Sequence, residues 1–220
     1  MQHLLQPFIV GLICCLFSAC ALLSKAEPRV PRYFSPERVT SGSAAAPAAA
    51  AVGGMRQLRL GNVRGSSELQ ERIMYRASPH EVGYHDGLRW TERPEVFLRR
   101  ALAHALFEER GVARALSGVA PTLDVELVAF EELGLPAKRA RVQVIMTLED
   151  DQRGSFQQTI VVEQPVQAKA DAALAGIEAL STALYSCVAQ IAARVSEELS
   201  NAPVAAAAQV EPGLTSAAPR

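Results

Sequence analysis

Residues 72–78 alternate between apolar and polar side chains, and a period of two is the pattern of a β-strand. The alternation places on one side of the backbone Ile73, Tyr75 and Ala77, and on the other Arg72, Met74 and Arg76. Ser78-Pro79 interrupts the run, because proline fixes φ and lacks the N–H that a sheet requires. Residues 81–85 resume the alternation, so the sequence predicts a strand, a short turn and a second strand.

After Trp90 the period changes from two to about 3.6, which predicts a helix over residues 92–110. Thr91 is placed to cap its first turn, and Pro94 falls in that turn, where a missing N–H costs least. The apolar stripe of this helix consists of Phe97, Leu98, Ala101, Leu102, Ala105 and Leu106. Gly111 follows the last apolar turn and is expected to end the helix.

Four more strands follow from the same alternation, one before this region and three after it. They are predicted over residues 55–63, 122–130, 139–148 and 156–163. The last three are joined by short connections, so they must run antiparallel, because a parallel return needs a crossover of a dozen or more residues.

A second and longer helix is predicted over residues 168–200. Its stripe is spaced by three and four and consists of Leu174, Ile177, Leu180, Leu184, Val188, Ile191, Val195 and Leu199. Cys187 lies within that stripe and is expected to be a small buried hydrophobe. The order of elements over residues 55–200 predicts an α+β fold, in which a single antiparallel-rich sheet packs against two amphipathic helices.

The two ends of the chain have different compositions from this domain. Residues 20–54 are rich in Ala, Pro and Ser and are interpreted as a flexible tether, and residues 201–220 as a disordered tail. Tyr33-Phe34 departs from this composition, and two alternatives remain open: a short edge strand around residues 32–35, or a tether that passes through unstructured.

The first 24 residues contain no charged side chain, and residues 8–23 are apolar apart from Ser18. This run is shorter than the ~20 residues that span a bilayer as a helix, so residues 1–19 are interpreted as a signal peptide. Small residues precede Cys20, which predicts cleavage before that cysteine and a covalent lipid on it, with no other cofactor. A simple signal peptide and an uncleaved anchor are the alternatives.

The charge of the chain is nearly balanced, with 22 basic and 23 acidic residues, and aromatic residues make up 5%. Nucleic acid is therefore not expected as a partner, because a phosphate-binding domain shows a basic excess. His80, His85, Asp86 and His104 match no metal-ligand spacing, and no nucleophile motif is present, so neither a metal site nor an enzyme is predicted. The acidic pairs, among them Glu131-Glu132, fall at predicted element ends and are interpreted as solvated.

Five residues of the region that opened this section are candidates for partner binding or for a structural role: Arg72, Tyr75, Arg76, Tyr84 and Trp90. Trp90 is interpreted as a core anchor, with a binding hot spot as the alternative, and the two tyrosines as its packing neighbours. The two arginines point together from one face of their strand, which suits either an ion pair with Glu81 or the carboxylates of a partner.

The same region resembles a known family. Leu69 to Arg76, Ser78-Pro79, Glu81 to Tyr84, Arg89-Trp90 and Pro94 are similar to the central signature of the ABC-type transport auxiliary lipoproteins. These are accessory lipoproteins of the MCE phospholipid-transport systems of two-membrane bacteria, and the resemblance covers roughly residues 55–200.

The resemblance implies a lipid-anchored domain at the periplasmic face of the outer membrane, which assists phospholipid traffic between the membranes. Its implied partners are an MCE-domain protein and an ABC transporter complex, and family members also suggest a homo-oligomer. We expect it to act by docking to proteins. The alternative is a lipid-binding carrier, which requires an apolar cavity between sheet and helices. An envelope hydrolase, the third class, requires convergent polar residues in a cleft.

Overall fold

The computed structural model describes residues 30–37, 56–134, 136–151 and 154–201. The chain divides into the units Met1–Arg32 and Tyr33–Arg220, and the fold described here is that of the second. Its elements are β1 (Arg32–Phe34), β2 (Gln57–Gly65), β3 (Arg72–Ser78), β4 (Glu81–Trp90), α2 (Pro94–Ala103), the π-helix η2 (His104–Glu109), β5 (Ala113–Arg114), β6 (Thr122–Leu133), β7 (Arg139–Asp150), β8 (Gly154–Pro165) and α3 (Ala172–Ser200).

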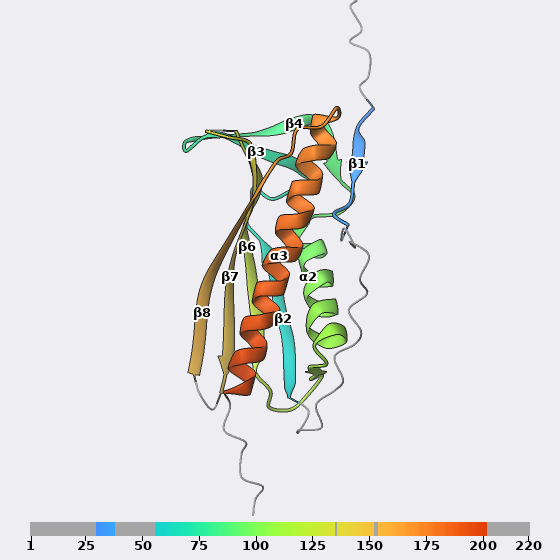
Figure 1. The fold of residues 1–220 in the computed structure, drawn as a ribbon. Helices are drawn as coiled ribbons and strands as arrows, with labels where there is room; N and C mark the ends of the chain where they lie inside the picture. The colour runs from blue at the N-terminus through green and yellow to red at the C-terminus, as the bar shows by residue number, and fades with distance from the viewer. Residues whose placement is uncertain (1–29, 38–55, 135, 152–153, 202–220) are drawn as a thin grey trace, which may run out of the picture. The chain divides into compact units, whose positions relative to one another are not determined.

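The strands form one mixed sheet, and α2 and α3 cover one of its faces (Figure 1). The predicted α+β fold is confirmed, as is the antiparallel order of β6, β7 and β8. The strand β6 is central: β7 pairs along one of its edges, while β2 and β3 share the other edge, one after the other. Both of these pairings are parallel, as is that of β2 with β5, and the sequence analysis predicted none of the three.

A β-bulge in β6 changes which residues face the helices. The register of β6 with β7 pairs Leu127 with Val144 but Ala129 with Gln143, so Val128 is an extra residue. Before the bulge, the odd-numbered residues of β6 face the helices. After it the even-numbered ones do, because Phe130 lies opposite the buried Val142. The strand also continues to Leu133 instead of ending at Phe130 as predicted.

The first helix begins at Pro94, which occupies its first turn as predicted. Its N-cap is Arg93, whose side chain makes no capping hydrogen bond, so the expected cap at Thr91 is wrong. The last turn widens into the π-helix η2, and Gly111, at a φ of 64°, ends the helical segment as predicted.

The long helix α3 begins at Ala172 rather than at residue 168, because the Asp171 side chain accepts hydrogen bonds from the backbone N–H groups of Ala173 and Leu174. Its predicted stripe is buried except for Leu174, which is 41% exposed. Among the described residues α3 is the one helix long and apolar enough to cross a bilayer. Here its apolar side packs on β7 and β8, which explains the composition.

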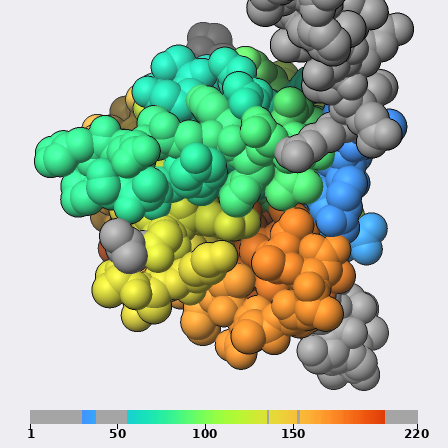
Figure 2. All heavy atoms as spheres, turned by 90° about the horizontal axis from the view of Figure 1, so that it is seen from above, coloured from blue at the N-terminus to red at the C-terminus, as the bar shows by residue number. Residues whose placement is uncertain are grey.

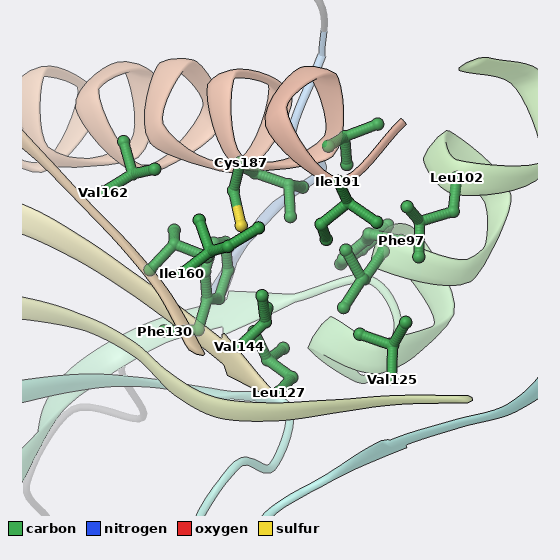
Figure 3. Close-up of a cluster of buried hydrophobic side chains, with 14 of the residues drawn as sticks. Phe97, Leu102, Val125, Leu127, Phe130, Val144, Ile160, Val162, Cys187 and Ile191 are labelled. Atoms are coloured by element: carbon green, nitrogen blue, oxygen red, sulfur yellow. The ribbon is translucent and has the colours of Figure 1, made fainter. Parts of the chain in front are cut away.

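Cys187 lies in the middle of this packing, and Figure 3 shows it on α3 beside Ile160 and Phe130 of the sheet. The predicted burial is confirmed: its relative exposure is 0%, and burial raises the pKa of the thiol to about 12.

We expect the native Cys187 thiol to resist alkylation at neutral pH, because the reactive thiolate is absent and reagents cannot reach it. Iodoacetamide labelling followed by mass spectrometry, with and without urea, measures this. Rapid labelling of the native protein at Cys187 would contradict the packing of α3.

Around Tyr33-Phe34 the sequence left open either a short edge strand or an unstructured tether, and the structure shows the strand β1. Arg32–Phe34 forms the edge strand next to β4, and the backbone N–H of Thr91 donates to the carbonyl of Phe34. The sheet thus begins within the range that was interpreted as tether. The predictions for the signal peptide, the lipid on Cys20 and the tail lie outside the described residues.

Candidate functional site

The candidate residues on β3 and β4 lie on two different faces of the sheet. The register pairs Met74 with Tyr84 and Tyr75 with Gly83. Residues opposite one another on paired strands share a face, so Tyr75 faces the helices and Tyr84 faces the open side. The two tyrosines therefore lie on opposite faces of the sheet, so the expectation that both pack against Trp90 is wrong.

Trp90 is a core residue with a relative exposure of 1%. Its ring lies 5.0 Å from that of Phe130 on β6 and 6.1 Å from that of Phe97 on α2, measured between centroids. These two phenylalanines, rather than the tyrosines, are its aromatic neighbours. The structure places Trp90 at the junction of α2 with the sheet, as the core-anchor interpretation requires.

The open face of the sheet carries a buried carboxylate between two arginines. Glu131 on β6 is fully buried, and the Arg76 Nε atom on β3 donates to it over 3.1 Å. From β7, Arg141 donates to the same carboxylate. The side chains of Arg76 and Arg141 are 28% and 25% exposed, so the arginines shield Glu131 while they remain in contact with solvent. Arg76 thus pairs with Glu131 and not with Glu81, which corrects the expected ion pair.

Arg72 lies on the same open face, two residues before Met74. Its guanidinium carbon stacks 4.6 Å from the centre of the Tyr84 ring. The Tyr84 hydroxyl donates to the carbonyl of Glu68 over 3.0 Å, which fixes the ring. Met74, which lies on the same side of β3 as Arg72 and Arg76 as predicted, is only 4% exposed, because it lies between Tyr84 and Glu131. We refer to Arg72, Arg76 and Arg141, with Glu131 and Tyr84, as the arginine cluster.

The helix-side face carries a different group, centred on Glu132. Its Oε2 atom lies 3.2 Å from His85 Nε2, and the His85 ring lies 5.0 Å from that of Tyr75. A Cβ atom on Gly176 of α3 would meet the Glu132 carboxylate, so the glycine leaves room for this carboxylate in its present position. Consecutive residues of a strand point to opposite faces, and the bulge at Val128 decides that Glu132, and not Glu131, faces the helices.

A pocket of about 440 Å³ opens beside this group. It lies between the β3–β4 hairpin and the β6–β7 turn, which Figure 2 shows from above in teal-green and yellow. Polar and apolar groups both line it, and the lining includes Tyr75, Tyr84, His85, Asp86, Glu132 and Lys138. It lies at the end of the sheet and is therefore not the apolar cavity between sheet and helices that a lipid carrier requires.

The other histidine of interest, His104, contacts Glu108 and Glu109 at the end of the first helical segment. Within the described ranges, no group of three or more His, Cys, Asp or Glu side chains is arranged to hold a metal ion. In the part of the chain that the structure describes, the carboxylate that contacts His85 is that of Glu132.

Sequence reasoning missed Arg141, Glu131, Glu132 and His85 as parts of these two groups. Glu131-Glu132 was interpreted as a solvated pair beyond the end of a strand, whereas both residues belong to β6. Two adjacent acids followed by a strand with Arg139 and Arg141 were the available signal. This signal could not identify the ion pairs, because they depend on the parallel pairing that brings β3 next to β6.

The comparisons with solved structures agree with this fold. A protein from Xanthomonas campestris superposes with a TM-score of 0.56 at 18% identity, over 67% of this chain and 88% of its own. An uncharacterized protein superposes with a TM-score of 0.58 at 16% identity, over 76% of this chain and 99% of its own. At these identities the similarity concerns the fold alone. A search of curated proteins found no match.

The comparison with protein families is more specific. The family described as "ABC-type transport auxiliary lipoprotein component" matches residues 40–195, a range that begins between β1 and β2 and ends in α3. It includes the arginine cluster, the pocket and Trp90. The match covers well over half of the chain and agrees with the resemblance in the signature strands. The chain therefore belongs to the ABC-type transport auxiliary lipoprotein component family.

Proposed function

We propose that this protein is a lipid-anchored adaptor of an MCE-type ABC lipid-transport system, held at the periplasmic face of the outer membrane through Cys20. It acts by docking to the MCE-domain protein and the transporter complex, and so assists phospholipid traffic between the membranes. Family membership supports the association with an ABC transport system. The finer role rests on one surface of the domain.

That surface is the free edge of β8. This strand pairs with β7 from Asp150 opposite Gly154 to Arg139 opposite Pro165, with no break in register, and no described strand pairs with its other side. Twelve residues of backbone thus form a regular edge. Such an edge offers a row of unpaired N–H and C=O groups to an extended segment of another chain.

Proteins usually protect such edges with charges, bulges or a covering loop. The one charged residue of β8, Glu163, pairs back to Arg139 on β7 over 3.0 Å, and Pro165 stands only at the end of the strand. Val161 at the middle of the edge is 52% exposed. Among the described residues no strand covers this edge, and a neutral edge rich in β-branched residues is what strand addition by a partner requires.

The carrier alternative receives less support. It requires space between α3 and the sheet, but the stripe from Leu184 to Leu199 is at most 5% exposed and packs directly on the strands. Opening a cavity of a few hundred Å³ there would require α3 to move away from the sheet and would disrupt the hydrophobic core.

Val161→Lys tests the docking proposal, because a lysine on a strand edge opposes the approach of another strand. We expect recovery of MCE and transporter subunits from detergent-solubilised envelopes to fall by about tenfold, the effect of losing about 1.4 kcal/mol. Val96→Lys, on the 39% exposed Val96 of α2, adds the same charge away from the edge and should leave recovery unchanged.

Mass spectrometry of the mature N-terminus tests the anchor in the same preparation. A diacylglyceryl cysteine at position 20 is expected. Recovery of no MCE subunit with the unmodified chain, or equal recovery with both lysine variants, would overturn the docking proposal at the β8 edge.

A further inference from the structure

We propose that the arginine cluster on the open face of the sheet binds the phosphate group of a phosphate ester, either a free ester or the headgroup of a phospholipid. This surface is separate from the β8 edge, so the inference goes beyond the docking proposed above.

The first argument is the charge of the cluster. Arg72, Arg76 and Arg141 bring three guanidinium groups to one face, and Glu131 is the only carboxylate that bonds to them among the described residues. A single buried carboxylate is neutralised by one arginine. The two arginines on Glu131 therefore keep a surplus of one positive charge, to which Arg72 adds a second on the same face, so this surface attracts an anion.

The second argument is the set of unused donors. The Nε atoms of Arg72 and Arg141 are buried and have no hydrogen-bond partner in the described part of the chain. Leaving a buried N–H of a charged group unpaired costs more than leaving a neutral one. In contrast, Nε of Arg76 lies within 3.2 Å of both carboxylate oxygens of Glu131 and is satisfied. The guanidinium groups of Arg72 and Arg141 are therefore incompletely hydrogen-bonded by the described residues, and an oxyanion bound to their other N–H groups would offset part of that cost.

The third argument is position and access. Met74 lies opposite Glu131, and Glu131 lies opposite Arg141, so these residues form one row across three strands. Arg72 stands next to this row on the same face of β3, held over the Tyr84 ring. Arg76 and Arg141 are each about one quarter exposed, so their remaining N–H groups can reach a ligand from solvent. Arginine forks of this kind recognise phosphate oxygens in pairs.

The experiment is calorimetric titration of the full-length protein in an uncharged detergent with glycerol 1-phosphate, a soluble short-chain phosphatidylglycerol, and glutarate. We expect the two phosphate ligands to bind and Arg72→Met to weaken both by about tenfold, as for one lost charge-assisted contact. Arg72 makes no bond to Glu131 in the structure, so its removal leaves no buried charge unpaired.

Arg64→Met is the matched control. Arg64 pairs with Glu126 over 2.9 Å on the same open face, farther along the sheet, and its loss changes the net charge equally. We expect this variant, and the edge variant Val161→Lys, to bind phosphate ligands unchanged. Arg141→Lys keeps a charge beside Glu131 but removes the fork, and should weaken binding as Arg72→Met does.

The outcomes separate the sources of the ligand. Tighter binding of the lipid than of glycerol 1-phosphate identifies a headgroup, and equal binding identifies the phosphate itself. Tighter binding of glutarate would overturn the proposal in favour of an acidic protein segment. Equal weakening by Arg64→Met and Arg72→Met, or no binding of either phosphate ligand, would also overturn it.

Discussion

Trp90→Ala is expected to lower the free energy of unfolding by about 3–5 kcal/mol, the cost of removing a large buried aromatic side chain. The indole is 1% exposed and lies between Phe97 of α2 and Phe130 of β6. Its loss would leave a cavity where α2 meets the sheet, and the helix would lose its anchor there. Urea unfolding followed by circular dichroism of the full-length protein in uncharged detergent measures this effect.

Trp90→Phe is the control, because a smaller ring keeps part of the contact with both phenylalanines and should cost less than half as much. The alternative interpretation of Trp90 as a binding hot spot makes a different prediction. In that case the alanine variant would remain as stable as the unmodified protein while losing its partner, which would contradict the core position described above.

The double variant Arg76→Met/Arg141→Met is expected to destabilise the fold by about 3–5 kcal/mol, because it leaves the carboxylate of Glu131 buried without a cation. Glu131 is fully buried, and the two arginines are the groups that the structure places on its oxygens. The same unfolding experiment applies.

Adding Glu131→Leu to the double variant should restore most of the lost stability, since an apolar triad of similar volume needs no buried charge. Recovery in the triple variant would show that the unpaired carboxylate, and not the packing of the arginine stems, causes the loss. A triple variant as unstable as the double variant would mean that the stems carry the effect.

The elements themselves could be predicted from residue patterns because each depends on local periodicity. β6, β7 and β8 alternate cleanly and are joined by short turns, so both their existence and their antiparallel pairing follow. The apolar stripe of α3 likewise predicted the burial of Cys187, because helix geometry alone fixes which side chains share a face.

The groups on the two faces could not be predicted, because they depend on contacts between distant segments. β2 pairs in parallel with the beginning of β6 and β3 with its end, and no local pattern encodes this division. The extra residue Val128 then reverses the side-chain alternation, which sends Glu131 to the arginines and Glu132 to His85. A strict period of two over residues 122–130 cannot show such a reversal.

Smaller errors have local causes. Thr91 resembles a cap in sequence, but its backbone N–H donates to the carbonyl of Phe34 in β1, and the N-cap is Arg93, two residues later. Leu174 fits the spacing of the α3 stripe, yet it lies in the first turn and remains exposed.

The place of β1 in the sheet has a consequence for how far the domain can move. If acyl chains are attached at Cys20, eleven residues separate them from Arg32, the first residue of β1. Even fully stretched, that spacer is at most about 40 Å long. Residues 38–55 lie between β1 and β2 in the sequence, so they do not lengthen the tether between Cys20 and the sheet. The domain would then remain within about one protein diameter of the lipid surface, and any partner must come to it there.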